Sequence, residues 1–173
     1  MNKIIFIALT AVAFLASSLN SEAQGRVNFS NTLNNRITNS LTDQPISGTN
    51  AFCIGLYVGP NGSTAAQLTL VGLTTNAPSG VPTDPFAGLF NGGNPFKLPI
   101  PYDDSAPVAF QIRAWTLADG ASYEAALLSG DPNLLIGQSA LGWVIPTLPP
   151  SLPSSLPNLF GVGPGQVSAF SLV

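Results

Sequence analysis

Catalysis by this 173-residue chain would depend on carboxylates, because the sequence contains no histidine and only one cysteine. Without imidazole there is no Ser-His-Asp or Cys-His nucleophile, no paired-histidine metal site and no HExxH motif. A glycosidase needs two facing carboxylates, about 5 to 9.5 Å apart depending on its stereochemistry. The candidate acids are Asp103, Asp104, Asp119, Glu124 and Asp131. Asp103 and Asp104 are neighbours in a proline-flanked loop, and the others fall at turns or at a helix start, so we expect loop acids and no enzyme.

Asp103 and Asp104 are adjacent and could serve a metal instead. Calcium binds six to eight oxygens, including backbone carbonyls, and accepts flexible loops. The chain has no D-x-D-x-D spacing around these two residues. Calcium at Asp103 and Asp104 is therefore one interpretation and solvated loop acids are the other, and no other cofactor is expected.

Gln111, Arg113 and Trp115 alternate along one extended run, which places them on one face of a strand. An amide, a guanidinium and an indole on one face are groups that bind a sugar ring. The structural alternative is that Arg113 pairs with Glu124 or an aspartate under the cover of Trp115. Such a pair would tie the sheet to the short helix that contains Glu124. We favour the structural interpretation and keep the three residues as the candidate binding site.

Charge is sparse in this chain. Five Lys and Arg stand against eight Asp and Glu, and charged residues make up 8% of the sequence, where soluble domains average about 25%. Five cations are too few for the roughly six to ten phosphates that DNA-binding proteins typically contact, so we expect no nucleic-acid partner. Low charge also weakens long-range repulsion, which allows neutral surfaces to approach one another.

Two long runs with a period of two indicate the central strands. Residues 52–58 and 67–73 flank the turn sequence Gly59-Pro60-Asn61-Gly62 and predict a hairpin, and residues 108–116 predict another strand. Shorter strands are expected within 26–29, 134–136, 140–145 and 167–172. One short helix is expected within 122–129, with Ser122 as N-cap. Cys53 and Trp143 are expected in the core. This pattern predicts an all-β antiparallel sandwich, immunoglobulin-like or jelly-roll-like.

Long connections rich in proline and glycine separate the strands. Residues 74–106 carry no regular pattern, and Phe86, Leu89, Phe90 and Phe96 are expected to pin this segment to the sandwich. Residues 146–157 hold five prolines in twelve positions and predict extended polyproline II. We interpret this second segment as a stiff loop rather than as a ligand for an aromatic groove.

The N-terminus has the pattern of an export signal. Lys3 precedes the apolar run 4–15, and Ser21-Glu22-Ala23 provides a small-x-small cleavage site. The apolar run is shorter than the ~20 residues needed to cross a bilayer. We therefore expect a signal peptide at 1–23 and a single secreted domain at 24–173, with no membrane span after cleavage. The lone Cys53 cannot form a disulfide within the chain.

Several strand motifs resemble a bacterial family. They are Gly-Arg-Val-Asn-Phe-Ser-Asn at 25–31, Ile-Gly-Leu-Tyr-Val-Gly at 54–59 and Phe-Gln-Ile-Arg-Ala-Trp at 110–115. In these the chain is similar to uncharacterised exported proteins of Verrucomicrobia and related bacteria, of the type associated with PEP-CTERM sorting tails. The sequence departs from them in having no Pro-Glu-Pro motif, hydrophobic span and basic tail at its end. The resemblance implies an envelope or extracellular location and a β-sandwich, without any activity or site residue.

These observations favour a secreted, non-enzymatic structural or adhesive protein of the bacterial envelope or extracellular matrix. The alternative is a carbohydrate-binding module, for which Trp115, Tyr57 or Tyr102 would stand exposed in a row. A more distant alternative is a hydrolase that uses loop carboxylates, which would hold two of them in a concave pocket. Polysaccharide and other envelope proteins are the expected partners.

Overall fold

The computed structural model describes residues 24–99, 102, 106–147 and 156–173. The segment 1–23, expected to be a signal peptide, lies outside this part of the chain. The strands are β1 (Arg26–Val27), β2 (Thr38–Asn39), β3 (Gln44–Pro45), β4 (Phe52–Pro60), β5 (Thr69–Thr75), β6 (Phe96–Lys97), β7 (Val108–Thr116), β8 (Ile136–Gln138), β9 (Gly142–Val144) and β10 (Ser171–Leu172). The helix is α2 (Tyr123–Leu127), and short 3-10 turns are η1 (Leu33–Asn35), η2 (Ala65–Gln67) and η3 (Leu117–Asp119).

The two longest strands form the centre of the largest sheet. β4 and β7 pair antiparallel along their whole length, from Phe52 opposite Thr116 to Pro60 opposite Val108. β5 flanks β4, while β8 and β9 follow one another along the other edge of β7. The predicted hairpin and the predicted long strand at 108–116 are both confirmed.

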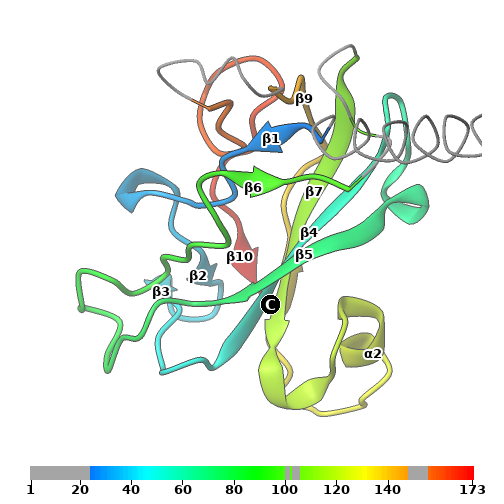
Figure 1. Cartoon of the computed structure of the whole chain (residues 1–173). Coiled ribbons are helices and arrows are strands. Elements are labelled where there is room, and N and C mark those ends of the chain that lie inside the picture. Colours follow the sequence, from blue (N-terminus) through cyan, green and yellow to red (C-terminus); the bar gives the residue numbers. More distant parts are fainter. Residues whose placement is uncertain (1–23, 100–101, 103–105, 148–155) are drawn as a thin grey trace, which may run out of the picture.

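Two small sheets form the second layer (Figure 1). β1 pairs with β6, and β2 lies between β3 and β10, with the β2–β10 pair parallel. The main core lies between these elements and one face of the large sheet. The large sheet contributes Phe52, Ile54, Leu56, Val58, Val108, Phe110, Ile112 and Ala114, and the second layer contributes Val27, Phe29, Ile37, Leu98 and Leu172, among others. The chain thus has the predicted all-β, antiparallel, sandwich-like fold with one short helix.

The other face of the central strands is covered as well. α2 lies against it near one end of the sheet (Figure 1), where Cys53 and Trp115 pack with Ala126. Further along, Tyr57 and Ala109 pack with Leu68. β4 and β7 therefore have both faces buried. This is unusual, because antiparallel sheets commonly have one face exposed to water. Cys53 is buried and free, as expected.

Buried asparagines hold the irregular segments where no ladder exists. The Asn76 side chain accepts from the Phe52 amide at 2.9 Å and donates to the Gly48 carbonyl at 2.6 Å. Asn31 does the same between the Phe90 amide and the Gly88 carbonyl, both at 2.8 Å. The two side chains give the Phe52 and Phe90 amides an acceptor and link segments that are far apart in sequence.

Two expectations about apolar residues are wrong. Phe90 is buried and Phe96 packs against the core, but Phe86 is 59% exposed and does not belong to the hydrophobic core. Trp143, expected in the core, is 45% exposed. Strand alternation explains the exposure of Trp143, because its neighbours Gly142 and Val144 take the inward positions of β9.

Within the described residues, no helix is long and apolar enough to span a membrane.

Candidate functional site

The predicted binding residues Gln111, Arg113 and Trp115 do share one face of β7, but that face is closed. Gln111 is 3% exposed, Arg113 6% and Trp115 0%. Tyr57, opposite Gln111 on β4, is also buried. Trp115 and Tyr57 therefore form no exposed aromatic row for a carbohydrate. The trio is positioned inside the protein, where it cannot meet a large ligand.

Arg113 instead forms a sheet–helix clamp with Tyr57, Gln111, Glu124 and the Ala65 carbonyl. Arg113 Nη1 lies 2.7 Å from Glu124 Oε1 of α2, and its Nε donates to Gln111 Oε1 at 2.9 Å. Its Nη2 donates to the Ala65 carbonyl of η2 at 2.6 Å. The guanidinium stacks 4.0 Å from the centre of the Tyr57 ring. The predicted Arg113–Glu124 pair is confirmed, but Tyr57 rather than Trp115 covers it.

Trp115 has a different partner. Its indole Nε1 donates to the Gly120 carbonyl at 2.8 Å, and its ring meets Tyr123 edge to face. The indole thus anchors the start of α2 and has no free donor. Its role is packing.

The titratable groups of this face are shifted away from reactivity. Burial and the neighbouring Glu124 carboxylate raise the pKa of Tyr57 to about 12, although the Tyr123 amide and Arg113 oppose the shift. The Tyr57 hydroxyl donates to Glu124 Oε2 at 3.1 Å. Burial also raises the pKa of Tyr123 and of the Cys53 thiol. All three groups stay protonated at neutral pH, and the Glu124 carboxylate of the clamp is engaged by Arg113 and by the Tyr57 hydroxyl.

Of the candidate acids that the structure describes, Glu124 is bound to Arg113, whereas Asp119 and Asp131 lie close to each other. Asp103 and Asp104 lie outside the described residues, so the structure does not test the calcium hypothesis. Partial burial and the nearby Asp131 carboxylate raise the pKa of Asp119. Asp131 is exposed, and its Oδ1 accepts from the Asn133 amide at 2.8 Å, which is an ordinary Asx turn. The part of the chain that is described contains no group of three or more His, Cys, Asp or Glu that could hold a metal.

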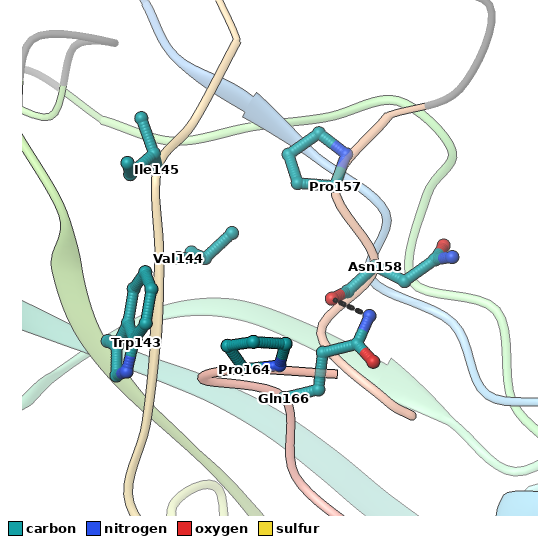
Figure 2. A pocket seen from close by; sticks show the side chains of 7 residues that line it. All are labelled: Trp143, Val144, Ile145, Pro157, Asn158, Pro164 and Gln166. Carbon is teal, nitrogen blue, oxygen red and sulfur yellow. Dashed lines mark hydrogen bonds between the residues drawn. The ribbon is translucent and has the colours of Figure 1, made fainter. Parts of the chain in front are cut away.

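A groove at Trp143 is the clearest candidate for binding (Figure 2). It has a volume of about 250 Å³ and runs between the strand that carries Trp143 and the segment that returns toward β10. We call it the Trp143 groove; its lining residues are Trp143, Val144, Ile145, Pro157, Asn158, Pro164 and Gln166. None of these seven side chains is charged. Indole, proline rings and amides together suit a neutral ligand with both apolar and polar faces.

Glycine and hydrogen bonds hold Trp143 in place. Gly165 has a φ of +77°, and a Cβ there would lie 2.7 Å from the indole Cδ2 and 2.8 Å from Cε2. The indole therefore rests on the bare Gly165 backbone, and the Trp143 amide donates to the Gly165 carbonyl at 2.9 Å. Gly142 lets β9 pack closely on Phe110, because a Cβ at this position would lie 2.5 Å from the Phe110 ring. The position of the Trp143 indole is thus fixed in the absence of a ligand.

Gln166 is held by two hydrogen bonds. Its Oε1 accepts from the Gly163 amide at 2.8 Å, and its Nε2 donates to the Asn158 carbonyl at 3.1 Å (Figure 2). An amide nitrogen carries two N–H donors and an amide oxygen accepts twice, so one donor and one lone pair remain. The amide is oriented and still has bonding capacity toward the groove.

Leu141, Trp143 and Ile145 form what we call the contact stripe. Each is about half exposed, while Gly142 and Val144 between them are buried. Three exposed apolar side chains at alternate positions make a continuous strip on one strand face. The stripe borders the Trp143 groove, which includes two of its members.

A second groove of about 260 Å³ lies at Ile46. It is lined by Asn39, Thr42, Pro45, Ile46, Ser47, Phe52, Pro82 and Leu135. It is also uncharged, but its one aromatic ring, Phe52, is buried. It lacks an exposed flat surface on which a ligand ring could stack.

Sequence reasoning missed the Trp143 groove for an identifiable reason. The apolar character of residues 141–145 indicates core, whereas their alternation places Leu141, Trp143 and Ile145 on the face opposite to Gly142 and Val144. Gln166 carries no motif of its own and meets Trp143 through tertiary contacts alone. Comparison with protein-family models, with curated proteins and with solved structures finds no match to this chain.

Proposed function

We propose that the chain is a secreted, non-enzymatic adhesive protein of the bacterial envelope or extracellular matrix that makes contacts through the contact stripe. One observation carries the proposal: three apolar side chains of one strand face remain half exposed beside an uncharged groove. Contiguous exposed apolar surface is typical of interaction sites. The secreted location is supported by the expected export signal and by the family resemblance.

Two further observations support a role by contact rather than by catalysis. Arg113 and Glu124 are engaged with each other in the clamp, where Arg113 is buried. The Trp143 groove and the groove at Ile46 contain no carboxylate. The low overall charge keeps electrostatic repulsion between contacting surfaces small.

Adhesion of beads coated with the protein to cells and isolated matrix of the encoding bacterium tests the proposal. Contacts without ion pairs predict adhesion that is unchanged between about 20 mM and 500 mM NaCl, a range that screens charges strongly. Leu141→Ser removes a half-exposed apolar group worth about 1 kcal/mol of contact, so binding should weaken about fivefold.

Leu41→Ser is the matched control, because Leu41 is highly exposed and lies outside the stripe. It should leave adhesion unchanged. Adhesion that salt abolishes, or that Leu41→Ser weakens as much as Leu141→Ser, would contradict the proposal.

A further inference from the structure

The ligand class of the Trp143 groove can be inferred from what lines it. The groove has no cation for phosphate, sulfate or carboxylate, and no carboxylate for an amine or metal ion. Charge matching therefore favours an uncharged partner. A wholly apolar partner would leave the Gln166 amide and the Asn158 carbonyl facing it without new bonds, which is unfavourable on burial.

Sugar rings are uncharged and combine an apolar face with polar groups at the edge. One face of a pyranose ring carries C–H groups that pack on an aromatic ring, and its edge carries hydroxyls that donate and accept hydrogen bonds. In Figure 2 the indole of Trp143 and the amide of Gln166 lie on different sides of the same groove. An apolar platform and an oriented amide are thus available to one ligand at once.

The size of the groove limits the ligand further. Pockets for drug-sized molecules measure roughly 300 to 1,000 Å³, and this groove of about 250 Å³ is smaller and open. It suits one ring of a longer chain, with the neighbouring rings outside. Preorganisation favours such weak contacts, since Trp143 and Gln166 are already held by Gly165, Gly163 and Asn158 and lose little freedom on binding.

We propose that the Trp143 groove binds one ring of a neutral polysaccharide, with the ring face on the Trp143 indole and its hydroxyls on the Gln166 amide and the Asn158 carbonyl. This inference rests on the proposed adhesive function and names its partner. It moves the carbohydrate-binding hypothesis from the buried face of β7 to the exposed side of β9.

Affinity electrophoresis of the purified protein tests the inference. The gels contain hydroxyethylcellulose, glucomannan, xylan or dextran as neutral probes, and alginate as an anionic one. At least one neutral probe should retard the protein, and alginate should not. Trp143→Ala should weaken the retardation at least tenfold. Phe86→Ala, which removes another exposed aromatic ring outside the groove, should leave it unchanged.

A measurement on the unaltered protein guards against misfolding of the variant. Acrylamide quenches exposed indoles, so it should quench Trp143 and spare the buried Trp115. The retarding polysaccharide should protect the quenchable fraction. Retardation by no neutral probe, retardation that survives Trp143→Ala, or no protection of Trp143 would each overturn the inference.

The adhesion assay separates this inference from the proposed function. If adhesion depends on Leu141 although no polysaccharide binds, the proposed function stands and only the inferred ligand is wrong. If adhesion is independent of Leu141, the proposed function itself is wrong.

Discussion

At the scale of single residues, Arg113 shows how a charged side chain is kept inside a sheet. It makes hydrogen bonds to Gln111, to Glu124 and to the Ala65 carbonyl, and it stacks on Tyr57. A buried charge is tolerated only when its hydrogen bonds and its charge are compensated in this way. The clamp therefore stabilises the contact between β7, α2 and η2 rather than binding a ligand.

Arg113→Ala should destabilise the protein by about 2–4 kcal/mol, because it leaves Gln111 Oε1 without a donor, removes the shorter of the two hydrogen bonds to the Ala65 carbonyl and opens a void. Arg113→Lys should recover only part of this, since an ammonium cannot reproduce the planar set of donors. Chemical denaturation measures both. Arg36→Ala is the control: Arg36 donates to the Pro85 carbonyl at an exposed position, and its loss should cost less than about 1 kcal/mol. Equal effects of the two alanine variants would show that the clamp is not structural.

Tyr57 should make the protein lose stability in alkali. Its pKa is about 12 in the folded state and near 10 in the unfolded chain. Between these values the unfolded state releases the proton that the folded state keeps, so the free energy of unfolding falls as pH rises. The contribution is fully present below about pH 10 and is lost as pH rises toward 12.

Denaturation curves of the protein and of Tyr57→Phe at pH 8, 10 and 11 measure this effect. Tyr57→Phe should be less stable at pH 8 by about 1 kcal/mol, since it loses the bond to Glu124. Its decline above pH 10 should be shallower, though not absent, because the pKa of Tyr123 is also raised. Parallel curves for the two proteins would refute this account of Tyr57.

At the scale of elements, the edge of β7 shows how two short strands replace one long one. β8 and β9 pair with different halves of β7, and Ser139 lies in the gap between them. Its amide donates to the Ile112 carbonyl at 2.8 Å, and its hydroxyl accepts from the Ile112 amide at 3.0 Å. The Ser139 side chain thus completes the pairing of β7 where the edge strand breaks.

Ser139→Ala should cost about 1–3 kcal/mol, because it leaves the buried Ile112 amide without an acceptor. Thermal unfolding measures the loss, and amide hydrogen exchange should show faster exchange at Ile112. Ser168→Ala, at an exposed serine, should change stability by less than about 0.5 kcal/mol. Slow exchange at Ile112 in the Ser139→Ala protein would contradict the role assigned to the hydroxyl.

The elements also show what local patterns can and cannot predict. The period of two in 52–58 and 108–116 predicted β4 and β7, and Ser122 predicted the start of α2, where its hydroxyl accepts from the Ala125 amide. The same alternation could not reveal that α2 and η2 cover the second face. Trp115 is buried by Tyr123 and Ala126 of the segment that follows β7 and by Cys53 of β4, and only the tertiary fold packs these residues against its ring.

At the scale of the whole molecule, the clamp and the neutral binding surface lie in different parts of the described chain. Arg113, Glu124 and Tyr57 interact with one another in the clamp, whereas the exposed side of β9 carries neutral and apolar groups. The sparse charge of the sequence predicted such a neutral surface. Its location was not predictable, because Trp143, Asn158 and Gln166 come from segments that only the fold places side by side.

The two tryptophans allow the most direct test of the claim that contacts are made through the Trp143 face. Each gives one indole N–H resonance in a ¹H–¹⁵N spectrum, and Trp143→Phe assigns them. On titration with solubilised matrix material, we predict that the Trp143 resonance shifts and that of the buried Trp115 stays in place. A shift of Trp115 alone, or binding that moves neither resonance, would contradict the account.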